Sequence, residues 1–209
     1  VRRAAARVAQ DARPVRIDGA ALARMADALA REPLQPPGLD PAHHHLGSDA
    51  DTIAFVVTID AINFGSGWFP RLRKRPGCSG YLTIATALRE RFERDGALTA
   101  GELRALRAAD VAALLGQDVA HPDVAELMAL FARALGDLGA WLERRFDASF
   151  VALVERADGS AERLVRWLAE MPLYRDVSAY VARDGEELAV PLYKRAQITV
   201  SDLAAAFGG

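Results

Sequence analysis

The sequence has little cysteine and no long apolar run. Its one cysteine, Cys78, cannot form a disulfide within the chain, and no group of Cys and His residues has the spacing of a zinc site. We therefore expect a reducing, intracellular environment and no bound metal. No uninterrupted apolar stretch is long enough to cross a bilayer, and residues 1–18 lack the apolar core of a signal peptide. These features predict a cytoplasmic protein that does not bind a membrane.

The sequence also lacks an excess of charge of one sign. The 26 Lys and Arg residues against 28 Asp and Glu residues give a net charge of −2, so no bulk positive field attracts the chain to nucleic acid. A polymeric nucleic acid is therefore disfavoured as a partner. Hydrophobic residues make up 51% of the 209 residues, which is sufficient for the core of one domain. We expect a single domain over residues 1–209.

Helix signals are distributed along most of the chain. Apolar residues recur at helical spacing over residues 19–31. Ser79 and Ser160 stand where N-cap residues are expected, Thr99 and Glu102 fit a capping box, and Pro122 opens a long helix.

Two segments are less regular. The β-branched residues at 53–59 fit either a buried strand or a buried helix capped by Asp49 or Asp51, and we favour the helix. Asp184-Gly185 between two β-favouring runs predicts a hairpin, followed by a last helix from Tyr193 through Ala206. The sequence thus predicts a mainly α fold with one small β-hairpin.

The proline-rich loop at residues 31–51 contains His43, His44 and His45. Histidines can act as a metal ligand, a general acid or a hydrogen-bonding partner of a heterocycle, or they can simply lie in a solvated loop. Three consecutive residues seldom converge on one ion, which argues against a metal here.

Asp60, Asn63 and Phe64 would share one face of a helix, and the two polar residues interrupt an apolar segment. Buried polar groups need partners. Asp60 and Asn63 would either satisfy backbone groups of the following loop, or stand beside Phe64 while its ring stacks on a base.

Basic and aromatic residues meet again near the end of the chain. Tyr174, Arg175 and Asp176 could contact a ligand, or Arg175 could pair with Asp176; we slightly favour the ion pair. Lys194 and Arg195 stand at a predicted helix N-terminus, where free backbone N–H groups also favour an anion. That pair predicts either a phosphate site or a salt bridge to an acidic residue.

Four segments together resemble the queuosine-salvage family of queuosine 5′-phosphate glycosidases. These segments are DAINFGSGWFP, RKRPGCSGYLTIATAL, PLYRDV and LYKRAQITVSDL. The resemblance implies a helical fold related to DNA glycosylases and hydrolysis of the N-glycosidic bond of queuosine 5′-phosphate without a cofactor. The product would be queuine, which returns to tRNA modification.

The resemblance also assigns roles to residues. It implies that His44 or His45 contacts the queuine base, and that Tyr193, Lys194 and Arg195 shape the pocket for phosphate and ribose. The other residues that we expect to bind substrate are Asn63, Phe64, Tyr174 and Arg175.

Members of this family continue beyond the YKRAQ segment to aspartates that engage base and sugar, whereas this sequence ends at Gly209. We therefore expect the chain to be the N-terminal two-thirds of a longer protein, with its catalytic carboxylate beyond Gly209. Asp60 and Asp176 are weaker candidates for that role. Two alternative hypotheses are that the protein is a non-catalytic module that binds a nucleotide or modified base, or that it is a glycosylase of the DNA-repair type.

Overall fold

The computed structural model describes residues 1–12, 16–32 and 38–207. Part of the proline-rich loop, residues 33–37, lies outside this description. The helices and strands, in chain order, are α1 (Arg2–Asp11), α2 (Gly19–Leu29), α3 (Asp49–Ala61), η1 (Phe69–Arg71), α4 (Gly80–Asp95), α5 (Ala100–Ala105), α6 (Ala108–Leu114), α7 (Pro122–Phe146), α8 (Phe150–Ala157), α9 (Ala161–Leu168), η2 (Pro172–Tyr174), β1 (Val177–Val181), β2 (Glu187–Pro191) and α10 (Lys194–Phe207). The mainly α prediction with one hairpin is confirmed.

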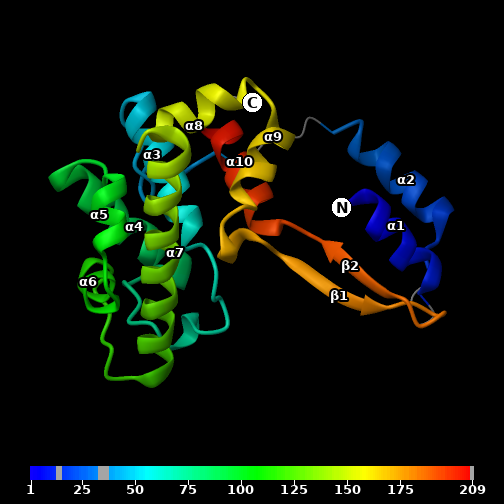
Figure 1. Cartoon of the computed structure of the whole chain (residues 1–209), viewed down its shortest axis with the longest axis horizontal. Helices are drawn as coiled ribbons and strands as arrows, with labels where there is room; N and C mark the ends of the chain where they lie inside the picture. The colour runs from blue at the N-terminus through cyan, green and yellow to red at the C-terminus, as the bar shows by residue number, and fades with distance from the viewer. Residues whose placement is uncertain (13–15, 33–37, 208–209) are drawn as a thin grey trace.

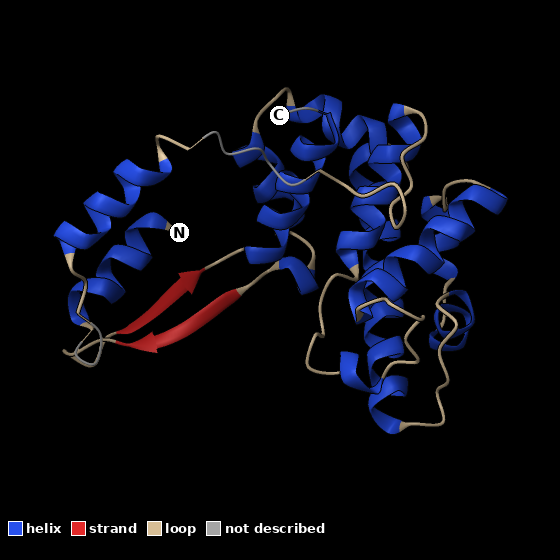
Figure 2. Ribbon diagram, turned by 180° about the vertical axis from the view of Figure 1, so that it is seen from behind, coloured by secondary structure: helices blue, strands red, loops and turns tan. Residues whose placement is uncertain are grey.

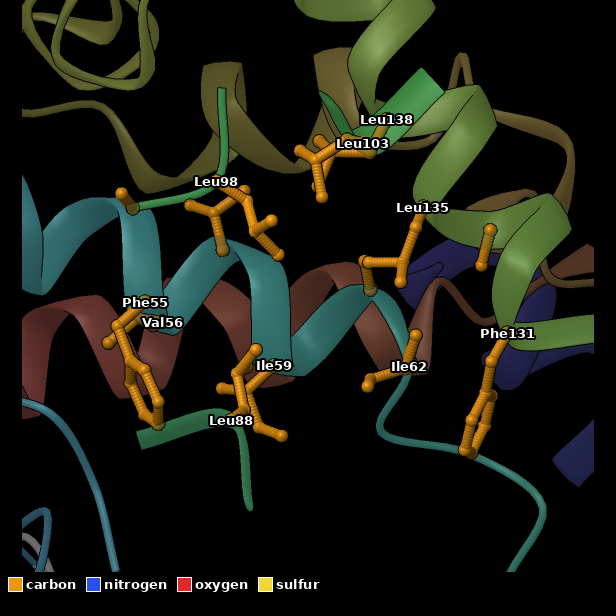
Figure 3. Close-up of a cluster of buried hydrophobic side chains, with 14 of the residues drawn as sticks. Phe55, Val56, Ile59, Ile62, Leu88, Leu98, Leu103, Phe131, Leu135 and Leu138 are labelled. Atoms are coloured by element: carbon orange, nitrogen blue, oxygen red, sulfur yellow. The ribbon is translucent and has the colours of Figure 1, made fainter. Parts of the chain in front are cut away.

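The core is built around α3 and the long helix α7. Every residue of α3 from Thr52 to Ala61 is buried, so this helix is surrounded by others. Figure 3 shows its side chains meeting those of neighbouring helices, with Leu88 of α4 and Leu135 of α7 among them. The ambiguous apolar run at 53–59 therefore belongs to a helix. Because this helix is enclosed on all sides, it has no polar face, and its sequence shows no helical periodicity.

Local capping explains where most helices begin. The Ser79 hydroxyl accepts from the backbone N–H of Leu82, Ser160 caps α9, and Thr99 forms its capping box with Glu102. These predictions are confirmed. The cap of α3 differs from our expectation, because Ser48 accepts from the Asp51 N–H while Asp49 and Asp51 lie inside the first turn.

One close contact fixes how α5 crosses α7. A Cβ placed on Gly139 of α7 would lie 2.3 Å from the carbonyl oxygen of Ala100 and 2.9 Å from the nitrogen of Arg104. The two backbones therefore approach to a distance that excludes a side chain at Gly139.

The hairpin extends away from the helical body, and α1 packs against β2 (Figures 1 and 2). β1 and β2 are antiparallel, with Val177 opposite Pro191 and Val181 opposite Glu187. The Arg7 guanidinium of α1 lies 2.9 Å from the Asp184 carboxylate in the turn. Gly185 has φ +86°, and the Ala182 N–H donates to the Glu186 carbonyl, so a three-residue loop with its glycine in the left-handed conformation joins the strands.

α2 is helical as its spacing predicts, yet its apolar stripe faces solvent. Met25 is 59% exposed and Leu22 56%, and within the described ranges no other helix or strand packs extensively on α2. None of the described helices is long and apolar enough to cross a membrane.

Candidate functional site

The candidate site lies where the C-terminal end of α3 meets α10, beside η2 and the start of α4. α10 packs against both α3 and α9 (Figure 1). This arrangement brings together Asp60 in the last turn of α3, Asn63 just after it, Tyr174 of η2, and Arg195 of α10. Residues that are more than 130 positions apart in the sequence thus share one polar region inside an apolar body.

Asp60 is the most deeply buried acid of this region, with 1% of its surface exposed. Its Oδ1 accepts a long hydrogen bond of 3.4 Å from the Asn63 amide. Its Oδ2 has no hydrogen-bond partner among the described residues. Burial raises the pKa of Asp60 to about 8, and the charge of Asp202 adds to the shift, while Asn63 and Thr199 oppose it. Asp60 therefore keeps its proton at neutral pH.

Arg195 is held by two aromatic rings. Its Cζ lies 4.7 Å from the ring centroid of Phe64 and 5.0 Å from that of Tyr174. The guanidinium is half-buried, and no carboxylate of the described ranges lies within 4.0 Å of it. Its Nη2 is buried and also has no described partner. Burial lowers the pKa of Arg195, and Tyr174 and Asp176 oppose that shift.

Phe64 and Tyr174 are each fixed in turn. The Phe64 ring meets the edge of Phe131 at a centroid distance of 5.1 Å. The Tyr174 hydroxyl is buried and lies 3.3 Å from the Thr199 hydroxyl. Burial and the nearby Asp60 raise the pKa of Tyr174. Both rings are therefore rigid supports for the guanidinium.

The three loop histidines point to different neighbours. His44 is buried at 7% exposure, its Nδ1 lies 2.9 Å from the Asp40 carbonyl, and its Nε2 lies 3.0 Å from the Tyr81 hydroxyl. His43 contacts the Thr86 hydroxyl instead. The His45 ring lies against Phe55 and Phe92. Among the three, His44 is the one joined to the polar region of Asp60.

Sequence reasoning missed three residues of this region: Tyr81, Thr199 and Asp202. Burial and the charges of Asp60 and Asp202 raise the pKa of Tyr81. Burial also raises the pKa of Asp202, and His44 opposes the shift. Thr199 and Asp202 stand four and seven positions after Arg195 on a helix, a spacing that places all three on one face. That spacing is a signal that could have found them.

The remaining predicted residues lie outside this region. Arg175 is exposed, and the expected ion pair with Asp176 is wrong, because no such pair occurs in the described part of the chain. The Asp176 carboxylate instead accepts from the Lys194 N–H at 3.3 Å and so caps α10. Its position explains how a helix with two cations in its first turn is tolerated.

Tyr193 and Lys194 lead into α10. Tyr193 has φ +51°, an uncommon left-handed conformation for a residue with a side chain. Lys194 is exposed and lines an open cavity of about 600 Å³ with Gln197, Ile198 and Ser201. Lys194 and Arg195 thus face different surroundings, although they are adjacent in the sequence.

The site offers hydrogen-bonding and acid–base groups. No group of three or more His, Cys, Asp or Glu residues within the described ranges could hold a metal ion. A neutral carboxyl, a half-buried cation and a phenol joined to an imidazole can together bind an anionic, polar ligand and supply a proton.

The family model and the similar proteins all indicate the same family. A family model described as Queuosine salvage protein matches residues 43–209. A Sphaerobacter thermophilus protein named queuosine 5′-phosphate N-glycosylase/hydrolase is 34% identical over 208 residues, covering 97% of this chain and 62% of that protein. Proteins of the same name from Bos taurus and Mus musculus are 28% and 27% identical, covering 93% and 75% of this chain.

The chain spans about 60% of the length of the first two relatives, at 62% and 59%. The family match extends over the loop histidines, the end of α3, and all of α10 that the structure describes. It thus includes every residue of the polar region around Asp60 and Arg195. On this match the chain belongs to the queuosine salvage protein family.

Proposed function

We propose that this protein binds queuosine 5′-phosphate and hydrolyses its N-glycosidic bond, releasing queuine. Membership of the family and the printed names of the relatives support this reaction. The observation that carries the proposal is the guanidinium of Arg195, held over Phe64 and Tyr174 without a carboxylate among the described neighbours.

A half-buried cation of this kind favours an anionic ligand. Desolvation costs the guanidinium free energy, and neither aromatic ring satisfies its N–H donors. A phosphate accepts two hydrogen bonds from a guanidinium in a fixed planar geometry. The buried Nη2 has no hydrogen-bond partner among the residues that the structure describes, so we assign the 5′-phosphate to Arg195.

Cleavage of the N-glycosidic bond requires groups that stabilise the developing charge and groups that transfer a proton. As the C–N bond breaks, its electron pair passes to the base, positive charge develops on the sugar, and water adds at the anomeric carbon. A group that donates a proton to the departing base lowers the barrier. Asp60 carries a proton at neutral pH, so we assign it to proton donation or hydrogen bonding rather than to charge stabilisation.

The predicted site residues divide into two sets under this proposal. His44, Asn63, Phe64, Tyr174 and Arg195 form the inner set around Asp60. His45, Arg175, Tyr193 and Lys194 lie outside it, and we expect smaller effects from them. The substrate is a monomeric nucleotide rather than a polymer, in keeping with a net charge of −2.

The reaction is tested by incubating the 209-residue chain with queuosine 5′-phosphate and following free queuine by chromatography. The Sphaerobacter thermophilus relative is the positive control. Release of queuine by the chain supports the proposal. Absence of release while the relative is active would show that these 209 residues do not suffice for hydrolysis, and tight binding without release would favour the alternative of a nucleotide-binding module.

Two adjacent cations provide a matched pair of variants for the phosphate. Arg195→Met should weaken binding of queuosine 5′-phosphate by about tenfold to a hundredfold and leave binding of the nucleoside queuosine unchanged. Lys194→Met removes the same charge from the exposed side of α10 and should have little effect. Equal losses for phosphorylated and unphosphorylated ligands in Arg195→Met would refute the assignment.

A further inference from the structure

The first turns of α10 carry Arg195 and, four residues later, Thr199. Positions four apart on a helix are neighbours, and a rise of 1.5 Å per residue separates these two by about 6 Å along the axis. Arg195 is half-buried, whereas Thr199 has 0% of its surface exposed. The helix thus places a buried hydroxyl group one turn away from the residue that carries the guanidinium.

Tyr174 of η2 contacts both of these residues. Its hydroxyl lies 3.3 Å from the Thr199 hydroxyl, and the Cζ of Arg195 lies 5.0 Å from the centroid of its ring. η2 packs against α10, and Tyr174 is only 2% exposed. One phenol ring therefore spans a turn of α10, with its hydroxyl at Thr199 and its ring beside the guanidinium.

The direction of the two hydrogen bonds of Thr199 follows from its single hydrogen. The Thr199 hydroxyl donates to the carbonyl oxygen of Arg195, which can only accept, at 3.3 Å. The hydrogen of Thr199 is used there, so Tyr174 is the donor in the other bond. Both distances are long for bonds between oxygen atoms, which makes each bond weak. Together they join the Tyr174 ring to the backbone of the residue whose guanidinium lies beside that ring.

Burial keeps the Tyr174 ring in this position. A buried hydroxyl without a hydrogen-bond partner costs free energy, and Thr199 is the partner that the described part of the chain offers to Tyr174. The ring therefore cannot move away from the guanidinium without losing this bond. Phe64, the second ring beside Arg195, is held by a contact with Phe131 and has no polar atom on its side chain. Thr199 thus acts on the one ring of the pair that a hydrogen bond can fix.

We propose that Thr199 is a positioning residue of the phosphate site. Its hydroxyl holds the Tyr174 ring beside α10 and so determines where the Arg195 guanidinium presents its N–H donors. A phosphate accepts two hydrogen bonds from a guanidinium only in a fixed planar geometry. A displaced guanidinium should therefore weaken binding of the phosphate and leave the rest of the ligand unaffected. This inference rests on the proposed function, because it takes the 5′-phosphate to bind at Arg195.

The role of Thr199 is tested by calorimetric titration of the 209-residue chain with queuosine 5′-phosphate and with queuosine. Thr199→Val keeps the branched shape and removes the hydroxyl. It should weaken queuosine 5′-phosphate about threefold to tenfold and leave queuosine unchanged. Thr199→Ser keeps the hydroxyl and should bind both ligands as the unaltered chain does. Equal losses for the two ligands in Thr199→Val would refute the positioning role.

Thr58 of α3 provides the matched control. It is also 0% exposed, and its hydroxyl has no hydrogen-bond partner among the described residues. Thr58→Val therefore makes the same chemical change at an equally buried position and should alter neither affinity. If Thr199→Val binds both ligands as Thr58→Val does, the hydroxyl of Thr199 has no role in the phosphate site.

Double variants show whether Thr199 acts through Tyr174 and Arg195. Tyr174→Phe should cause the same selective loss as Thr199→Val, and the two changes together should weaken the phosphorylated ligand no more than Thr199→Val alone. In an Arg195→Met chain, Thr199→Val should have no further effect. Additive losses in either double variant would refute the proposal.

A spectroscopic readout decides the positioning role without a ligand. Aromatic rings shift the resonances of protons that lie over their faces, so the Nε proton of Arg195 should resonate upfield of an exposed arginine. Its signal is assigned by its loss in Arg195→Met. Thr199→Val should reduce the displacement and Thr199→Ser should preserve it, whereas an unchanged resonance in Thr199→Val refutes the role. If the unaltered chain binds neither ligand, the proposed function fails, and this resonance still decides whether Thr199 holds the guanidinium.

Discussion

Arg195 lies over the ring of Phe64, with the guanidinium carbon 4.7 Å from the ring centroid. The two residues come from α10 and from the turn after α3, which are far apart in the sequence. Gly65 makes this turn possible, because it has φ +83° and a Cβ there would lie 2.6 Å from Leu127. The position of the Arg195 guanidinium in the proposed phosphate site therefore depends on how α10 packs on α3, the most buried helix.

Asp60 should make the stability of the protein depend on pH. Its folded-state pKa of about 8 lies above the ordinary value of 3.8, so the folded chain holds a proton that the unfolded chain releases. The resulting stabilisation is complete below about pH 4 and is lost as the pH rises toward 8. The side chain of the Asp60→Asn variant cannot ionise. The Tm of this variant minus the Tm of the unaltered chain should therefore be larger at pH 9 than at pH 5. Equal differences at the two pH values would contradict a protonated Asp60.

Gly139 and Gly136 of α7 form a matched pair for the packing of α5. A Cβ at Gly139 would lie 2.3 Å from the Ala100 oxygen, whereas at Gly136 the nearest atom is 4.0 Å away. Gly139→Ala should lower the free energy of unfolding by about 1–3 kcal/mol. Gly136→Ala should raise it by up to about 1 kcal/mol through helix propensity. Urea denaturation measures both, and similar effects at the two positions would argue against the close crossing.

Asp176 should serve as a cap rather than as a catalytic carboxylate. Because it accepts from the Lys194 N–H, Asp176→Ala should cost about 1 kcal/mol of stability. Asp176→Asn can still cap and should retain both stability and queuine release. Loss of more than about 99% of the activity in a stable Asp176→Asn protein would instead indicate that its charge takes part in the reaction.

The tautomers of two histidines should differ. Nδ1 of His44 donates to the Asp40 carbonyl, whereas Nδ1 of His121 accepts from the Asp123 backbone N–H at 3.2 Å. Nitrogen-15 NMR of the two neutral rings should therefore find the hydrogen on Nδ1 in His44 and on Nε2 in His121. A hydrogen on Nε2 of His44 would contradict the hydrogen bond from His44 Nδ1 to the Asp40 carbonyl.

The helices of this protein could be predicted because their signals are local. Ser79, Ser160 and Pro122 mark helix starts within a few residues, and Asp184-Gly185 marks the hairpin. The cap of α10 could not be found in this way, since Asp176 reaches it from before the hairpin. The exposed stripe of α2 was also unpredictable, because spacing indicates an apolar face and not whether another element covers it.

The site was predictable only in part, for a similar reason. Sequence motifs point to Asn63, Phe64, Tyr174 and Arg195, and the structure brings these four residues into one region beside Asp60. Their roles in binding stay predictions. Tyr81 was missed because its contact with His44 joins residues 37 positions apart. Lys194 and Arg195 looked equivalent in the sequence, and only the direction in which α10 packs separates the exposed cation from the half-buried one.

The phosphate site at Arg195 is tested most directly by a crystal structure of the chain with queuosine 5′-phosphate bound. We expect the phosphate within hydrogen-bonding distance of the Arg195 guanidinium. A phosphate held by Lys194 in the open cavity beside α10, with no contact to Arg195, would contradict the proposed site.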